Sequence, residues 1–261
     1  MIRAALNFPP SGNNGSTAVV IGGVLFGVIG VVGVVTTVLF ETQFLDFGPR
    51  FLDGESAERR PHLILGAVVA TYSLVFLIMR GYDVAVLRAV VGSGEPTAPP
   101  FRFGVVRDGI SATVILLCYF VPSLALGTIG LVLRRPTGQG LHGVLNTVGA
   151  LSLLFGLFAL IVAAYLIPAA TALFATRRSI RAAFDRSALR ACVATEDYAA
   201  GWMIANLFRL LLLPVTIALQ ALLIGFFLRF YLRVSVQHMY GQSISNAIKT
   251  DTASHRDATA S

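Results

Sequence analysis

Charged side chains are scarce in this sequence. They account for 13% of its 261 residues, while 56% are hydrophobic and the mean hydropathy is +0.77. In a soluble protein about a quarter of the residues are charged, because the surface must be covered with polar groups. The sequence therefore excludes a soluble globular domain and predicts an all-α, polytopic transmembrane helix bundle of five to six spans.

Cysteine, histidine and lysine are also rare. Two isolated cysteines provide neither a disulfide framework nor a metal-ligand spacing. The four histidines stand far apart along the chain, so they give no set of metal ligands, and we expect neither a metal nor a cofactor. Lysine occurs once, as Lys249, so arginine carries the positive charge, and its planar guanidinium suits phosphate headgroups.

Motifs for catalysis are missing as well. The chain has no phosphate-binding loop, no His-Glu-x-x-His pair and no Gly-x-Ser-x-Gly elbow. Gly92-Ser93-Gly94 stands in a proline-rich connector without a nearby histidine, which favours a linker over a nucleophile. No Asp or Glu falls inside the apolar runs, which argues against ion coupling through an intramembrane carboxylate. We expect a protein without enzymatic activity and without catalytic residues.

Four apolar runs are long enough to cross a bilayer, which needs about 20 helical residues. They are residues 17–40, 63–79, 110–133 and 144–176. Because proline cannot continue the hydrogen-bond pattern of a helix, we expect Pro168 to divide the fourth run into a span and a short interfacial turn.

The C-terminal apolar region, residues 198–240, has two interpretations. In the first, the uncharged stretch between Arg209 and Arg229 is a fifth span, with an arginine snorkelling at each end. In the second, Pro214-Val215-Thr216 is the tip of a hairpin, which makes six helices with both termini in the cytoplasm. The hairpin divides the basic residues fourteen to six across the membrane instead of eleven to nine, so the positive-inside rule favours it.

Two basic segments are predicted to lie at the interface as amphipathic helices. In residues 81–92 the apolar side chains recur at a spacing of four, and in residues 177–192 Ile180 and Phe184 form an apolar strip beside arginines. The order span, basic helix, span thus occurs twice, which resembles a weak internal repeat. The candidate lipid or partner contacts are Arg80, Tyr82, Arg88, Arg177, Arg178, Arg181, Arg186 and Arg190.

Polar side chains within apolar runs form a second candidate set. Arg209, Gln220 and Asn146 are the candidate intramembrane polar site. Arg209 is the most informative, because a charge inside the membrane marks a functional site by default. Snorkelling, hydrogen bonding between helices and a ligand role are its three alternative interpretations. Residues 1–241 are predicted to form a single transmembrane domain, followed by a polar, disordered tail over residues 242–261.

Short motifs in a fixed order resemble a known family. They include Ala4-Ala5-Leu6-Asn7-Phe8-Pro9, Arg80-Gly81-Tyr82, Tyr165-Leu166-Ile167-Pro168-Ala169-Ala170 and Phe230-Tyr231. Together they resemble the archaeal, mainly haloarchaeal, multi-pass membrane proteins of domain of unknown function family 4013. The chain departs from that pattern by an insertion over residues 35–62. The resemblance implies several membrane helices, a final helix pair and an archaeal plasma-membrane location, and it implies no activity.

The sequence thus favours an integral membrane module without enzymatic activity, whose basic interfacial helices contact anionic lipid or another membrane protein. The alternative is a transporter or permease subunit, motivated by the weak repeat and by prolines that could break helices within the membrane. Nucleic acid is excluded as a partner, because the arginines stand at the ends of apolar runs and are not interleaved with aromatic residues.

Overall fold

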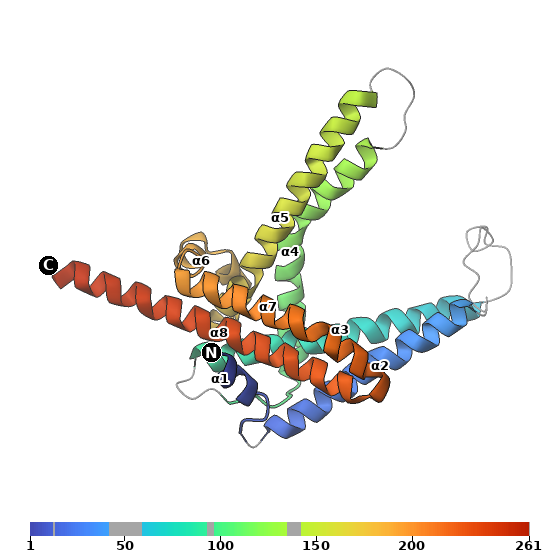
Figure 1. Ribbon diagram of the computed structural model, residues 1–261, viewed down its shortest axis with the longest axis horizontal. Helices are drawn as coiled ribbons and strands as arrows, with labels where there is room; N and C mark the ends of the chain where they lie inside the picture. Colours follow the sequence, from blue (N-terminus) through green and yellow to red (C-terminus); the bar gives the residue numbers. More distant parts are fainter. Residues whose placement is uncertain (13, 42–58, 93–96, 135–141, 261) are drawn as a thin grey trace.

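The computed structural model describes residues 1–12, 14–41, 59–92, 97–134 and 142–260, and throughout these ranges the regular elements are helices. Figure 1 shows how they are arranged. The elements are α1 (Ile2–Asn7), α2 (Gly15–Glu41), α3 (Arg59–Gly92), α4 (Gly104–Leu133), α5 (His142–Arg177), η2 (Ile180–Phe184), α6 (Arg186–Val193), α7 (Glu196–Ala218), η3 (Leu219–Leu222) and α8 (Ile224–Ala260).

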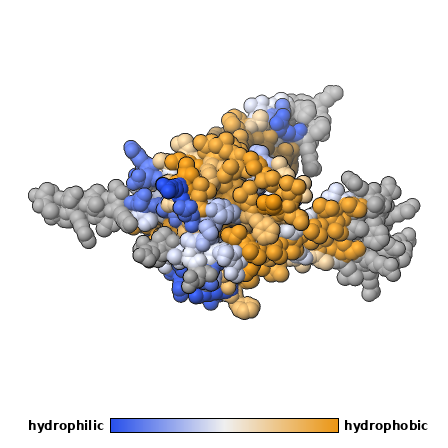
Figure 2. Space-filling model, turned by 60° about the horizontal axis from the view of Figure 1, so that its bottom comes forward, coloured by the Kyte–Doolittle hydropathy of each residue, from blue (hydrophilic) through white to orange (hydrophobic). Residues whose placement is uncertain are grey.

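Five of the described helices are long and apolar enough to cross a membrane, which confirms the predicted fold class. Most of their side chains face outward, and Figure 2 shows hydrophobic residues covering much of the face in view. Exposing so many apolar side chains to water would be unfavourable, so this surface belongs in lipid. The candidate spans are Gly15–Val38, Ile64–Gly92, Gly104–Leu133, Gly143–Arg177 and Glu196–Leu222.

The helices pair as hairpins, and the hairpins diverge. In Figure 1, α4 and α5 run side by side in one direction and α2 and α3 in another, while α8 packs against α2 and α3 and pairs with α7. The protein core lies where these hairpins meet. One buried cluster joins the second halves of α3 and α5 to α4, α6, α7 and α8, and another joins α2, α3 and α8.

Helix α3 corrects the first predicted interfacial helix. Residues 81–92 continue α3 without a break, and the apolar strip of Tyr82, Val86 and Val90 is buried inside the protein. Gly81 lies inside this helix at a point of close contact with α4. A Cβ at this position would stand 1.7 Å from the Val105 carbonyl oxygen. A spacing of four identifies a buried face and a membrane-facing one equally well, so the pattern did not distinguish them.

Helix α5 also continues where a break was predicted. Pro168 lies inside it and leaves the Ala164 carbonyl without its helical donor. The indole Nε1 of Trp202 donates to that carbonyl from α7 at 3.2 Å. A side chain of a neighbouring helix therefore replaces the missing backbone bond, and the helix is preserved. The part of α5 that includes and follows Pro168, residues 167–175, is entirely buried.

The C-terminal hairpin is present, with its tip a few residues later than predicted. Pro214 lies inside α7, and the turn is made by η3 and Leu223, whose φ of 61° is left-handed. Helix α8 then returns along α7 and continues through the predicted disordered tail to Ala260. Within this part of α8, Ile244 and Ala247 are buried.

Candidate functional site

Three of the eight predicted contacts, Arg88, Arg178 and Arg181, line a cleft at one end of three spans. The ends of α3 and α5, the start of α4 and the η2 helix enclose a cavity of about 750 Å³, which we call the basic cleft. It is lined by Arg88, Gly104, Arg107, Asp108, Ser111, Phe174, Arg178, Ser179, Ile180 and Arg181.

Ion pairing divides the arginines of the basic cleft into two kinds. Arg88 is held in place, since it pairs with Asp108 at 3.0 Å and donates through Nε to the Ala175 carbonyl at 2.9 Å. Arg107, Arg178 and Arg181 are exposed, and within the described residues they form no ion pair. These three guanidinium groups are therefore free to receive an anion from outside.

The segment after α5 positions the remaining predicted arginines. Arg177 pairs with Asp185 at 2.9 Å, and Asp185 caps α6 by accepting the amides of Ser187 and Ala188. Hydrogen bonds from the Ser187 hydroxyl, the Ala188 amide and Arg177 lower the pKa of Asp185 to about 2. Arg186 and Arg190 project from α6 and are exposed. The second predicted interfacial segment is thus a 3₁₀ turn followed by a short helix.

Two predicted contacts lie inside the protein. Tyr82 is 1% exposed, stacks on Phe101 and donates to the Pro99 carbonyl at 3.0 Å, so it fixes the connection before α4. Arg80 is also largely enclosed, with Nη2 3.4 Å from the Ala112 carbonyl oxygen. Tyr82 is therefore not on the surface, and Arg80 lines an internal cavity instead of the basic cleft.

The structure separates the predicted intramembrane polar site. Asn146 lies far from the other two residues, where its Oδ1 accepts from Arg134 near the tip of the α4–α5 hairpin. Arg209 and Gln220 line two adjoining cavities between α2, α3, α7 and α8, which have Phe26, Phe76, Arg229 and Arg233 in common.

Sequence reasoning missed Asp83, which lies inside the candidate span Ile64–Gly92 and is 2% exposed. Both its oxygens accept from Arg233 of α8, at 2.9 and 2.6 Å. A buried carboxylate therefore lies within a candidate span, four residues beyond the apolar run of residues 63–79 to which the prediction referred. The available signal was the apolar stretch that continues past Asp83, which marks the helix as longer than the run of residues 63–79.

Comparison with known proteins places the chain in a family. The family model described as "Protein of unknown function (DUF4013)" matches residues 64–230. The chain belongs to this family. The match confirms the predicted family and extends from α3 to the first part of α8. It therefore includes the arginines of the basic cleft, as well as Arg209 and Arg229, but not Arg233. It begins after the predicted insertion of residues 35–62. Comparison with curated proteins and with solved structures gives no match.

Proposed function

We propose that this DUF4013 protein is a membrane module without enzymatic activity, whose basic cleft binds anionic lipid headgroups. The observation that carries the proposal is the set of three exposed arginines without ion pairs, Arg107, Arg178 and Arg181, at one end of three apolar spans. Each arginine near an anionic leaflet contributes about 1 kcal/mol of attraction. We further propose the plasma membrane of an archaeon as the location, with the cleft on the cytoplasmic side.

The ion pair between Arg88 and Asp108 supports this role for the basic cleft. Arg88 and Asp108 neutralise each other across the cleft wall and join the end of α3 to the start of α4. The net charge of the cleft then comes from Arg107, Arg178 and Arg181, which belong to different segments. A headgroup phosphate reaching all three would join α4 to the end of α5 by charge-assisted hydrogen bonds.

The transporter alternative has less support. It was motivated by prolines expected to break helices at membrane depth, yet Pro122, Pro168 and Pro214 all lie inside continuous helices. A transporter of the kind considered uses interrupted helices, whose free ends bind the substrate.

Lipid selectivity of the full chain tests the proposal. We would reconstitute it in phosphatidylcholine bilayers and compare spin-labelled phosphatidylglycerol with spin-labelled phosphatidylcholine as motionally restricted lipid. We expect phosphatidylglycerol to be preferred, and the preference to fall as salt screens the charges. Replacing Arg107, Arg178 and Arg181 together with glutamine should remove most of it. The control is Arg134→Gln, at the opposite end of α4. A preference that the triple variant retains in full would contradict the proposal.

A further inference from the structure

We propose that the cavities between α2, α3, α7 and α8 form a separate binding site for one anionic lipid molecule. Its phosphate group would lie among arginines, and an acyl chain would lie in an adjoining apolar groove. This site shares no lining residue with the basic cleft, and the proposal does not rest on the function proposed for that cleft.

The head of the lipid would occupy a cavity of about 270 Å³, which we call the arginine cavity. Residues from five helices line it, and they include four arginines and one aspartate, so three positive charges are left after pairing. An excess of that size in an apolar surrounding favours an anion strongly. The charged residues lining the cavity are Arg80, Asp83, Arg209, Arg229 and Arg233.

Existing contacts account for only part of this charge. Arg233 and Asp83 satisfy each other through two hydrogen bonds. Arg229 lies 5.4 Å from the centre of the Phe26 ring, and within the described residues neither Arg229 nor Arg209 forms an ion pair. Arg209 is at the centre of the 27-residue candidate span Glu196–Leu222. It is therefore about 20 Å from either end of that helix, and the carboxylate that lines the same cavity, Asp83, already pairs with Arg233.

Two buried donors point to the same ligand chemistry. Arg80 Nε and Gln220 Nε2 are buried and have no hydrogen-bond acceptor. Arg80 lines the arginine cavity, and Gln220 lines the neighbouring cavity of about 230 Å³. A buried donor without an acceptor is unfavourable, and charged donors prefer anionic oxygens. A phosphate group has enough oxygens to accept from several of these donors together.

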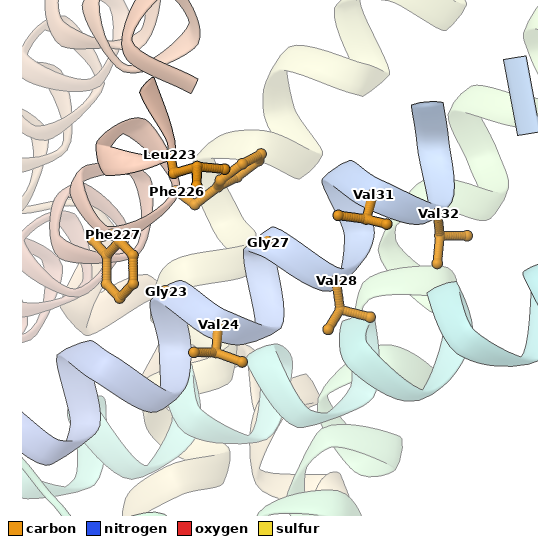
Figure 3. A pocket seen from close by; sticks show the side chains of 9 residues that line it. All are labelled: Gly23, Val24, Gly27, Val28, Val31, Val32, Leu223, Phe226 and Phe227. Atoms are coloured by element: carbon orange, nitrogen blue, oxygen red, sulfur yellow. The ribbon is translucent and has the colours of Figure 1, made fainter. Parts of the chain in front are cut away.

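An apolar groove continues from these cavities. It has a volume of about 400 Å³ and lies between α2 and the α7–α8 turn, as Figure 3 shows. Phe226 lines both the groove and the cavity of Gln220, and Arg229 and Arg233 line both that cavity and the arginine cavity. A lipid with its head in the arginine cavity and an acyl chain in the groove would pass along Phe226, which the groove shares with the cavity of Gln220. The groove is lined by Gly23, Val24, Gly27, Val28, Val31, Val32, Leu223, Phe226 and Phe227.

The glycines of α2 shape the groove in two different ways. Gly23 and Gly30 stand against the rings of Phe227 and Phe226, where an added Cβ would come within 2.1 and 2.4 Å of them. A Cβ on Gly27 would meet nothing within 4 Å. Gly27 therefore leaves the middle of the groove open, and a large side chain there would occupy the space proposed for the acyl chain.

Native mass spectrometry of the delipidated full chain in a neutral detergent tests the proposal. The protein would be titrated with phosphatidylglycerol and with phosphatidylcholine of the same acyl chains. We expect one phosphatidylglycerol to bind at least about tenfold more tightly, and Arg209→Gln to weaken it by about tenfold through the loss of a charged donor. Gly27→Phe and the milder Gly27→Leu should weaken it as well, by filling the groove.

Matched controls separate this site from others. Gly66→Phe adds the same ring where a Cβ also meets nothing within 4 Å, outside the groove, and should leave binding unchanged. Arg134→Gln removes an exposed arginine elsewhere, and Arg181→Gln removes one from the basic cleft. The proposal is overturned if the two lipids bind equally. It is also overturned if Arg181→Gln weakens binding while Arg209→Gln and the Gly27 variants do not. It is also overturned if inorganic phosphate displaces the lipid and binds the Gly27→Phe variant unchanged, since the ligand would then be a soluble anion.

Discussion

Asp83 is a carboxylate inside an apolar helix, and its partner Arg233 stands 150 residues later in the chain. The sequence could identify Arg209 as an unusual charge, because it interrupts a long apolar region by itself. It could not pair Asp83 with Arg233, since nothing local relates the two positions. Long-range pairs of this kind follow from how the helices pack, and packing between helices is not encoded in a spacing along one of them.

Replacing Asp83 with asparagine should destabilise the protein. It keeps the shape of the side chain but leaves the Arg233 guanidinium without its counter-charge, and breaking a buried pair in this way costs about 3 kcal/mol. Unfolding in detergent, followed by the fluorescence of the single tryptophan, would measure the loss. Asp108→Asn is the control, because that carboxylate and its partner Arg88 are partly exposed, and it should cost less than about 1 kcal/mol. Equal losses would contradict the assignment of Asp83 as the buried partner.

Arg178 combines an unfavourable backbone with a useful charge. Its φ of 53° is left-handed, a conformation that costs about 1 kcal/mol for a residue with a Cβ. Arg178→Gly should therefore stabilise the protein by about that amount and, if the basic cleft binds lipid, reduce the preference for phosphatidylglycerol. The same unfolding and lipid-selectivity measurements would detect both changes. Arg181→Gly should lower the preference without any gain in stability, because its φ is not in the left-handed region.

At the scale of helices, the sequence predicted where apolar segments occur better than where they end. Three expected boundaries, at Gly81, Pro168 and Pro214, lie inside continuous helices. Proline removes a backbone donor, and glycine lowers helix propensity, so both favour helix ends where no tertiary contact compensates. Here Trp202 supplies a donor to the Ala164 carbonyl, and Gly81 allows the close contact with α4. At Pro168 and Gly81 the compensating group belongs to another helix, which a local pattern does not contain.

Helices α3 and α4 should be sensitive to any side chain at their crossing. A Cβ at Gly81 would stand 1.7 Å from the Val105 carbonyl oxygen, and one at Gly109 would stand 2.0 Å from that of Leu77. Gly81→Ala should therefore push the helices apart and cost about 1–3 kcal/mol in unfolding free energy. Gly66→Ala, which meets open space in the same helix, should be neutral or slightly stabilising. A neutral Gly81→Ala would show that the two helices are not in close contact.

Helix α6 should lose its cap in strong acid. Because the pKa of Asp185 is lowered to about 2 in the folded state, the ionised carboxylate contributes stability above its ordinary pKa, near 4. That contribution is lost as the pH falls through 2. Cleavage by pepsin near Leu189 should thus increase between pH 4 and pH 2 relative to cleavage elsewhere in the chain. Asp185→Asn, which cannot ionise, should show the higher relative cleavage at both pH values.

At the scale of the whole molecule, the sequence predicted a helical membrane domain with a C-terminal hairpin, and both are present. It did not predict that the hairpins diverge. Divergence depends on where the close contacts lie, and α3 meets α4 at Gly81 and Gly109, well away from the tip of the α4–α5 hairpin. Gly130 and Gly149 bring α4 and α5 together beyond that crossing. The spacing of residues within one helix does not determine the angle between two helical hairpins.

Membrane topology should follow the hairpins. We expect single cysteines at Ser179 and Ser254 to be labelled from one side, and cysteines at Ser56 and Thr137 from the other, in intact cells with a membrane-impermeant maleimide. The two natural cysteines, one exposed and one buried, would first be replaced by serine or alanine. Labelling of a cysteine at position 254 together with one at position 56 would mean that the C-terminal region crosses the membrane once, giving five spans, and it would contradict termini on the same side.

The distance in sequence between Asp83 and Arg233 also sets an order of events during translation. A ribosome adds about 5–20 residues per second, so a separation of 150 residues delays the partner by roughly ten to thirty seconds. During that interval α3 is already made, and its carboxylate has only the ion pair with Arg80 of the same helix, at 3.8 Å. The two hydrogen bonds from Arg233 are then among the last contacts to form during biogenesis, and a nascent chain released before α8 would lack them.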